Sequence, residues 1–338
     1  MLAYIKYPEW LKPEVIPGLP FRWYAVMYIV AFSIAYLLMM YQIKNDPIGQ
    51  QVSKDEASSF FFWVIIGLII GARLFGTLVY DTSGKYWRAP WLIIWPFTDG
   101  KFTGLSGMSY HGGLIGALAG AFLFCRKKKK NFLMYTDLIT AGIPLGYTFG
   151  RLGNFINSEL FGRVTASPLG MIFQNATRFN VETESWAKNF VDKHNMQDLV
   201  RGKIVNLPRH PSQLYEAFFE GIVLWAIIWF IFRKRKKFDG QIISLYVIGY
   251  GLFRFFIEYA REPDDNLGYV ISFFPSIKDY HVFQTFFNFS LGQIFCLLMI
   301  IAGIAGLFIF SRRARKIAEM PDVENNGQSS KKGKKAAR

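Results

Sequence analysis

The chain has 338 residues, of which 52% are hydrophobic and 18% aromatic, and its formal net charge is +15. Apolar runs of about 20 residues recur along it, long enough for a helix to cross a hydrocarbon core of about 30 Å. This composition excludes a string of soluble domains and predicts an all-α polytopic membrane protein built as one helical bundle.

Residues 1–22 come first and are rich in proline, with Trp10 and Leu11 among them. They lack the charged start and continuous apolar core of a cleavable signal. They predict an interfacial arm that lies on the membrane surface.

Seven transmembrane helices follow within a membrane domain of residues 23–310. They are predicted at Trp23–Tyr41, Phe60–Tyr80, Ser106–Cys125, Phe132–Gly150, Ser212–Phe232, Ile242–Ala260 and Leu291–Phe310. Asp137, Pro144 and three glycines interrupt the fourth. Between the fourth and fifth, residues 163–208 predict a small extramembrane head. Residues 311–338 predict a disordered basic tail.

Positive charge is concentrated in Arg126–Lys130, Arg233–Lys237 and the tail, and each block follows an apolar run. This pattern is typical of cytoplasmic loops and of contact with anionic lipid, so membrane lipids are expected partners and nucleic acid is not. The positive-inside rule puts the N-terminus outside and the C-terminus in the cytoplasm.

Polar residues inside the predicted spans are the best pointers to function, because a charged side chain there costs about 2.5–3.5 kcal/mol. With the orientation above, nine of them fall in the outer half of the membrane, near Tyr24 at the start of the first span. We therefore expect one polar cavity at the depth of the outer headgroups. The residues are Arg73, His111, Arg151, Asn154, Gln213, Glu216, Glu220, Arg254 and Glu258.

Spacing supports this cavity, because Tyr250, Arg254, Glu258 and Arg261 recur at helical intervals and share one face. The planar fork of arginine matches phosphate, so several arginines at this depth indicate a phospholipid site. The alternative is that they only pair with the glutamates of the fifth and sixth spans and stabilise the bundle.

Other features are less specific. Gly112, Gly113, Gly116 and Gly120 form a small-residue stripe that favours close helix packing. His111, beside them, is either structural or a general base, since an imidazole exchanges protons near neutral pH. The two cysteines are expected to pack in apolar segments. No nucleophile elbow, metal-spaced cluster or Walker loop occurs, so no cofactor or metal is predicted.

Several motifs follow one another in the order of a known family, and with them the chain resembles the prolipoprotein diacylglyceryl transferases from about Trp23 to Phe310. The motifs are Arg22-Trp23-Tyr24, Gly107-Met108-Ser109-Tyr110-His111-Gly112-Gly113-Leu114-Ile115-Gly116, Gly150-Arg151-Leu152-Gly153-Asn154-Phe155-Ile156-Asn157-Ser158-Glu159-Leu160-Phe161-Gly162-Arg163, Arg209-His210-Pro211-Ser212-Gln213-Leu214-Tyr215-Glu216, Gly249-Tyr250-Gly251-Leu252-Phe253-Arg254 and Ser290-Leu291-Gly292-Gln293.

The resemblance implies a seven-span enzyme of the bacterial inner membrane, with a periplasmic N-terminus and head and a cytoplasmic C-terminus. Phosphatidylglycerol would donate a diacylglyceryl group to the lipobox cysteine that follows the signal peptide of a prolipoprotein. The implied catalytic positions are Tyr24, His111, Arg151, Tyr250 and Arg254. The implied substrate-binding positions are Arg151, Asn154, Glu159, Gly162, Arg254 and Glu258, and we add Arg73 because of its depth.

The implied chemistry is a thiol alkylation that releases glycerol 1-phosphate. The sulfur attacks the glyceryl carbon that bears the phosphate, which requires a deprotonated thiol and cations for the leaving group. Arg151 and Arg254 are the expected cations. His111 is the expected base, with a tyrosine or the lipid phosphate as alternatives.

Two rival functions remain open at this stage. A secondary transporter for an anionic solute would explain the glycine- and proline-interrupted fourth span. Against it, the polar residues lie away from the membrane midplane and no half-repeat is visible. The other rival is a lipid-binding scaffold without enzymatic activity.

Overall fold

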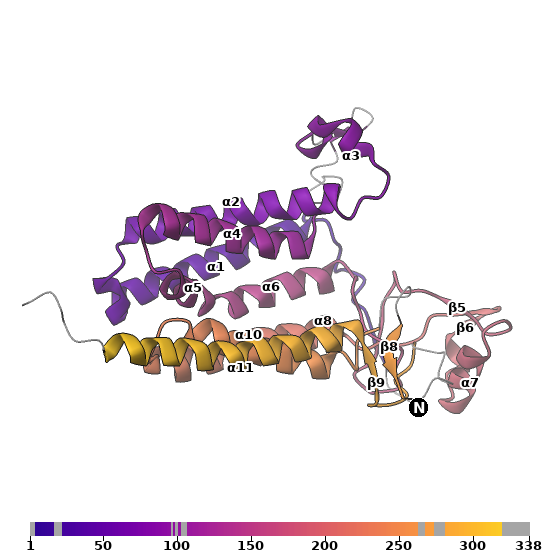
Figure 1. Cartoon of the computed structure of the whole chain (residues 1–338). Coiled ribbons are helices and arrows are strands. Elements are labelled where there is room, and N and C mark those ends of the chain that lie inside the picture. The colour runs from indigo at the N-terminus through magenta and orange to yellow at the C-terminus, as the bar shows by residue number, and fades with distance from the viewer. Residues whose placement is uncertain are drawn as a thin grey trace, which may run out of the picture.

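The computed structural model describes residues 4–16, 22–95, 97–98, 101–102, 107–262, 268–273 and 281–319. Its helices form an elongated bundle (Figure 1). A smaller unit of helix and short strands lies at one end, and α11 ends at the other (Figure 1).

Four helical segments are long and apolar enough to cross a membrane, which confirms the predicted class of polytopic helical membrane protein. They are α1 (Trp23–Asn45), α2 (Lys54–Leu78), a continuous helix over Ser212–Arg235 and α11 (Leu291–Ala318). The third is divided into α8 (Ser212–Glu216), the π-helical η4 (Ala217–Val223), α9 (Leu224–Ala226), the π-helical η5 (Ile227–Phe232) and the 3₁₀ turn η6 (Arg233–Arg235).

The other three predicted spans are shorter or broken. α4 (Tyr110–Lys128) and α10 (Gln241–Ile257) are single helices. The predicted span Phe132–Gly150 is instead two helices, α5 (Phe132–Thr140) and α6 (Ile143–Ile156), so its prediction as one helix is wrong. Pro144 lies in the first turn of α6, where a missing N–H is tolerated, and it prevents α5 from continuing.

Asp137 explains why a charged residue occurs in this broken segment. Its carboxylate accepts hydrogen bonds from the backbone N–H groups of Gly240 at 2.8 Å and Ile243 at 2.9 Å. Lys236 Nζ lies 3.0 Å from the same carboxylate. Asp137 therefore satisfies the free N–H groups at the start of α10, a helix more than a hundred residues away in the sequence.

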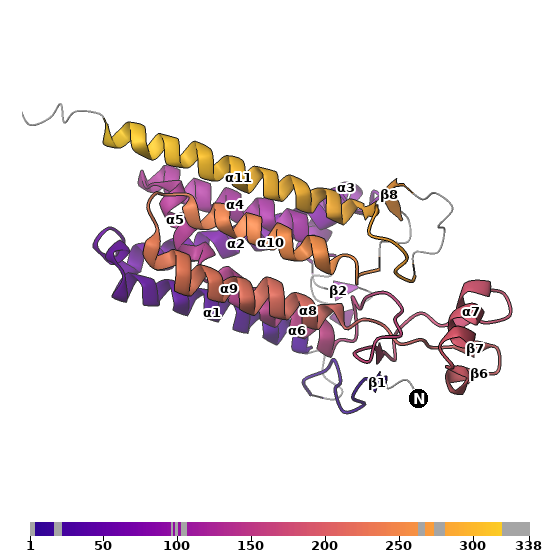
Figure 2. The same ribbon diagram turned by 90° about the horizontal axis from the view of Figure 1, so that it is seen from below.

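The bundle is built from helix pairs, α2 with α4, α1 with α6 and α10 with α11 (Figures 1 and 2). Glycines let the backbones of α2 and α4 touch. A Cβ atom at Gly116 would lie 2.1 Å from the carbonyl oxygen of Gly67, and one at Gly71 would lie 2.3 Å from that of Gly112. The glycine stripe is therefore a packing surface, as predicted.

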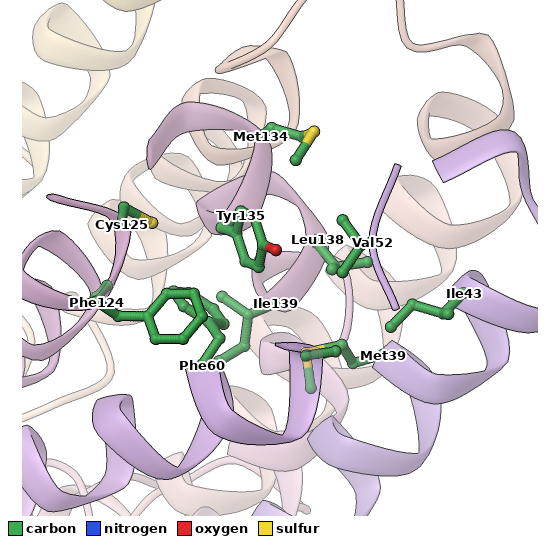
Figure 3. Close-up of a cluster of buried hydrophobic side chains, with 12 residues drawn as sticks. Met39, Ile43, Val52, Phe60, Phe124, Cys125, Met134, Tyr135, Leu138 and Ile139 are labelled. Atoms are coloured by element: carbon green, nitrogen blue, oxygen red, sulfur yellow. The ribbon is translucent and has the colours of Figure 1, made fainter. Parts of the chain in front are cut away.

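A buried apolar cluster (Figure 3) lies around α5, at the end of the bundle away from the small unit in Figure 1. The rings of Phe60, Phe124 and Tyr135 lie at its centre, with centroids 4.9, 5.4 and 5.6 Å apart. Asn131 caps α5 beside it, because its Oδ1 accepts from the backbone N–H of Leu133 at 3.0 Å. The cluster holds α1, α2, α4 and α5 together.

Residues 163–208 form the small unit at the other end. Its elements are β4 (Met171–Ile172), β5 (Phe179–Asn180), α7 (Ser185–Lys193), η3 (Gln197–Leu199), β6 (Val200–Arg201) and β7 (Ile204–Val205). The last three strands pair antiparallel in the order β5-β7-β6. Phe179, Phe190, Met196 and Leu207 are buried together, so this unit has its own core.

The amino-terminal segment packs into this unit. β1 (Ile5–Lys6) pairs parallel with β4, and Tyr7 is only 4% exposed. The Tyr7 hydroxyl lies 3.0 Å from the carbonyl oxygen of Phe155 and 2.9 Å from that of Ile156, at the end of α6. Residues 5–7 are therefore fastened to this unit and to α6, while the position of residues 1–22 on the membrane surface stays a prediction. Residues 1–3 and 17–21 lie outside the described part.

Other connections are short elements. η1 (Pro47–Gln50) joins α1 to α2, and α3 (Lys85–Arg88), η2 (Pro90–Ile93), β2 (Phe97–Thr98) and β3 (Lys101–Phe102) lie between α2 and α4. β8 (Tyr269–Ser272) pairs with β9 (Asn288–Ser290) ahead of α11. Residues 311–318 are helical rather than disordered, because α11 continues to Ala318. The rest of the predicted tail, residues 320–338, lies outside the described part.

Candidate active site

Arg151 projects from α6 into a polar cluster, and two other residues of α6 contact its side chain. Its Nε lies 2.6 Å from the hydroxyl oxygen of Tyr147 and 2.8 Å from Oε2 of Glu216. Its Nη1 donates to Asn154 Oδ1 at 3.3 Å. Tyr147, Arg151 and Asn154 are four and three residues apart, so they share one face of α6.

Glu216 of α8 brings together arginines from two parts of the chain. Its Oε1 lies 3.1 Å from Nη1 of Arg254 and 2.9 Å from Nη1 of Arg261, while its Oε2 faces Arg151. The Glu216 side chain is 0% exposed. Arg151 and Arg254, which lie on α6 and α10, thus meet on one buried anion.

Glu258 supports the same arginines from the end of α10. Its Oε2 lies 3.4 Å from Nε of Arg254 and 3.5 Å from Nε of Arg261, and its Oε1 accepts from the Ser290 hydroxyl at 3.0 Å. A Cβ atom at Gly292 would lie 2.6 Å from Glu258 Oε1, so only glycine leaves room for this carboxylate. The motif that starts α11 is therefore part of the site.

The two arginines keep hydrogen-bond donors available for a ligand. Among the described residues, no hydrogen bond uses Nη2 of Arg151 or of Arg254, and Arg254 Nη1 makes only ion-pair contacts. Both side chains are 16% exposed, whereas Glu216 and Glu220 are 0% exposed. The cations are therefore the accessible members, and a phosphate could take parallel N–H donors from both.

The rest of the predicted signature lies beside Arg151. Asn154 Nδ2 donates to Glu159 Oε1 at 2.9 Å, and Gln213 Nε2 donates to the Glu159 carbonyl oxygen at 2.6 Å. The N–H of Gly162 donates to the His210 carbonyl oxygen at 2.8 Å. A Cβ atom at Gly162 would lie 2.1 Å from the Ala260 carbonyl oxygen, so this position requires glycine.

The two predicted tyrosines contact the edges of this cluster. The Tyr250 ring stands edge-on to the Tyr147 ring, with centroids 5.8 Å apart. The Tyr24 hydroxyl is hydrogen-bonded to that of Tyr28 at 2.9 Å, and its ring lies 3.4 Å from where a Cβ atom at Gly153 would stand. Gly153 thus lets the Tyr24 ring approach α6 next to Asn154.

His111 and Arg73 have their described contacts elsewhere. His111 is exposed at the start of α4, and its Nδ1 lies 2.7 Å from the Tyr80 hydroxyl. Arg73 donates to the carbonyl oxygens of Ile93 at 2.5 Å and Leu92 at 3.0 Å, and so fastens the loop after α2. The catalytic role of His111 and the binding role of Arg73 stay predictions.

The sequence prediction missed Tyr147. Its hydroxyl lies between Arg151 and Glu220, with Glu220 Oε2 at 2.5 Å. A tyrosine four residues before a functional arginine on a helix was the available signal. In an apolar segment, however, such a tyrosine is usually interpreted as a residue that only packs against its neighbours.

A second ionic network, outside the spans, braces the loops around the signature. Arg209 pairs with Glu262, and Glu262 Oε1 accepts from His281 Nδ1 at 2.5 Å. Burial alone would raise the pKa of Glu262, but the hydrogen bond from His281 and the charge of Arg209 hold it below its usual value. Burial and the charge of Arg163 lower the pKa of His210.

A cavity of about 480 Å³ lies between the amino-terminal segment and the loop after α6. Glu14, Arg22, Asn157 and Glu159 are among its lining residues. Glu159 connects it through Asn154 to Arg151. Glu159 is thus shared between this cavity and the cluster around Arg151.

Comparison with known proteins identifies the family of the chain. The family model described as prolipoprotein diacylglyceryl transferase matches residues 14–309. The phosphatidylglycerol–prolipoprotein diacylglyceryl transferase of Treponema denticola is 51% identical over 334 residues, covering 94% of this chain and 98% of its own. Proteins of the same name from Treponema pallidum and Borrelia garinii are 50% and 44% identical, and cover 91% and 96% of this chain and 95% and 98% of their own. The chain belongs to the prolipoprotein diacylglyceryl transferase family.

Proposed function

We propose that this protein transfers the diacylglyceryl group of phosphatidylglycerol to the lipobox cysteine of prolipoproteins. A thioether forms and glycerol 1-phosphate leaves. The names of the relatives indicate this reaction, and one observation supports assigning it to particular residues. Arg151 and Arg254 contact the same buried Glu216 and keep donors available at their accessible side.

Arg151 and Arg254 hold the phosphate of the donor lipid in this proposal. As the carbon–oxygen bond breaks, negative charge grows on the departing phosphate, and fixed guanidinium donors stabilise that charge. Glu216 and Glu258 keep the two guanidinium groups oriented. The arginine side chains therefore need little rearrangement when the lipid binds. Electrostatic groups of this kind are often worth about 10²–10³-fold in rate each.

The other predicted site residues take supporting roles. Asn154 and Glu159 hold Arg151 from the far side, and Gly162 lets the loop after α6 approach the end of α10. Tyr24 and Tyr250 line the approach of the acyl glycerol. The sequence predicts His111 as the general base and Arg73 as a lipid contact, and both roles stay predictions. The signal peptide and lipobox of the prolipoprotein bind at the same polar space.

The test is transfer of mass to a cysteine. Purified protein in phosphatidylglycerol vesicles should add a diacylglyceryl mass to a lipobox peptide, and Arg151→Ala and Arg254→Ala should each abolish this gain. Arg201→Ala is the matched control, because Arg201 is exposed on β6 and its hydrogen bonds within the described residues go to the backbone carbonyl oxygens of Asp198 and Val200. Full activity of Arg254→Ala would overturn the phosphate clamp. No mass gain with the unmodified protein would favour a transporter or a lipid-binding scaffold.

We also propose that seven segments cross the bacterial inner membrane, with the N-terminus and residues 163–208 periplasmic and the C-terminus cytoplasmic. Charge supports this orientation, because α11 ends in a run of basic residues at the end of the bundle away from residues 163–208 (Figure 1). Lys203→Cys should react with an impermeant maleimide from the periplasmic side. Lys316→Cys should react only after permeabilisation, and the reverse result would invert the topology.

A further inference from the structure

The proposed reaction needs a group that takes the proton of the attacking thiol. Glu216 is poorly suited, because guanidinium nitrogens surround it at 2.8, 2.9 and 3.1 Å. Glu258 is held by two arginines and by the Ser290 hydroxyl. Both carboxylates are already neutralised by the cations that they orient.

Glu220 has a different environment. Its side chain is 0% exposed, and its nearest cation is Arg254 Nη1 at 3.8 Å. Glu220 Oε1 is buried and makes no hydrogen bond with a described residue. Its other oxygen, Oε2, lies 2.5 Å from the Tyr147 hydroxyl. Glu220 is therefore the least compensated carboxylate of this cluster.

Tyr147 connects this buried carboxylate to the accessible side. A phenolic oxygen has one hydrogen and two lone pairs. The hydrogen is directed to Glu220, and one lone pair accepts from Arg151 Nε at 2.6 Å. The second lone pair remains for an incoming donor. A thiol attacking a carbon whose phosphate is held by Arg151 would arrive beside this hydroxyl.

The charge of the cluster points the same way. Arg151, Arg254 and Arg261 balance Glu216, Glu220 and Glu258 when all are ionised. A phosphodiester adds one negative charge to this balanced set. Uptake of one proton by a carboxylate restores neutrality at low dielectric, where an unbalanced charge is costly. The titratable groups that face Glu220 from the packed elements are Tyr110, Tyr147, Glu216, Tyr246, Tyr250 and Cys296.

We propose that Tyr147 and Glu220 act as a proton relay for the thiol, an inference that rests on the proposed function. The S–H proton passes to the Tyr147 oxygen while Tyr147 gives its own proton to Glu220 Oε2. The sulfur electron pair forms the carbon–sulfur bond, and the carbon–oxygen bond breaks with its electrons on the phosphate. The proton then returns through Tyr147 to the glycerol 1-phosphate dianion, which restores the ionised carboxylate.

A nucleophile that needs no base tests this relay. The assay compares a lipobox peptide carrying cysteine with the same peptide carrying selenocysteine, whose selenol is already ionised at neutral pH. With cysteine, Tyr147→Phe and Glu220→Gln should each lower kcat about 10²–10⁴-fold, the usual contribution of a positioned base. With selenocysteine, the same variants should stay within about ten-fold of the unsubstituted protein, since base catalysis is not required.

Controls separate this inference from the proposed function. Tyr135→Phe removes the hydroxyl of another buried tyrosine, in the apolar cluster of Figure 3, and should leave both peptides unaffected. Equal losses on both peptides would mean that Tyr147 and Glu220 are only structural, and no loss on either would mean that the proton goes elsewhere. Rescue by selenocysteine in His111→Gln, but in neither relay variant, would make His111 the base. If the unsubstituted protein modifies neither peptide, the transferase proposal itself falls.

Discussion

Glu216→Gln is the substitution that isolates the central anion of the site. Glutamine keeps the size of the side chain and removes its charge. Three guanidinium groups, at 2.8, 3.1 and 2.9 Å, then lose their shared partner. The expected result is a less stable protein in which Arg151 and Arg254 are no longer held together.

The magnitude follows from burial and from the remaining contacts. Removing one partner of a buried ion pair costs about 3–5 kcal/mol, because the other charge stays uncompensated. Here the arginines retain 16–17% exposure and second partners, such as Glu258 for Arg254 and Arg261. We therefore expect the lower end, about 3 kcal/mol, which is about a hundred-fold in the unfolding equilibrium.

The free energy of unfolding of the purified protein in mixed micelles measures this cost. Glu220→Gln is the matched control, because it loses one ion-pair contact of 3.8 Å and its amide can still bond to Tyr147. Its cost should be no more than about 1.5 kcal/mol, the size of one hydrogen bond. Equal costs for the two variants would refute the view that Glu216 holds the cluster together.

Other expectations concern packing, pH and the shape of the cations. Gly116→Leu should abolish the folded monodisperse protein in size-exclusion chromatography, because a side chain there meets the Gly67 carbonyl, whereas Gly150→Ala has nothing within 4 Å and should be tolerated. Glu262 has a pKa below its ordinary 4.5, so its stabilising effect is present above that pH and lost below it. The thermal midpoint of the unsubstituted protein should therefore fall toward that of Glu262→Gln as the pH drops below 4.5, and a constant difference would contradict this. Arg151→Lys and Arg254→Lys should each lower kcat/KM by about ten-fold or more, because lysine cannot supply two parallel donors; unchanged kinetics would show that charge alone suffices.

The meeting of several polar residues was easier to predict from the sequence than the bounds of the helices. Charged residues in apolar helices are costly, so their shared depth was informative, and Arg151, Glu216, Glu220 and Arg254 do meet. Hydropathy could not reveal that Phe132–Gly150 divides into α5 and α6. Pro144 and the glycines marked an interruption, but hydropathy does not tell whether such residues kink a helix or divide it in two. The capping of α10 by Asp137 was also hidden, because it is a contact between distant parts of the chain.

Predicted depth in the membrane could not distinguish residues that lie in the same half of the membrane but whose side chains point in different directions. Arg73 and Arg254 are both predicted in the outer half of the membrane, yet the hydrogen bonds of Arg73 within the described residues go to the loop carbonyls of Leu92 and Ile93. His111 likewise contacts Tyr80. The direction of a side chain depends on the rotation of its helix about its own axis. The packing of α2 against α4 fixes that rotation, and a single sequence does not reveal it.

The pairing of the amino-terminal segment could not be predicted for a related reason. Proline, tryptophan and leucine in residues 1–22 suit a membrane surface, and Trp10 is indeed 80% exposed. The strand pairing of Ile5–Lys6 with Met171–Ile172 depends on a partner far along the chain. Nothing local in the segment signals that pairing.

The anchoring of Tyr7 has a practical consequence for handling the enzyme. Its two hydrogen bonds reach the carbonyl groups that close α6, one turn beyond Arg151. We expect a fusion partner or affinity label placed ahead of Tyr4 to weaken these hydrogen bonds and to lower activity without contacting Arg151. Attachment beyond Ala318, at the far tip of α11, leaves it undisturbed and is the better choice for purification and immobilisation.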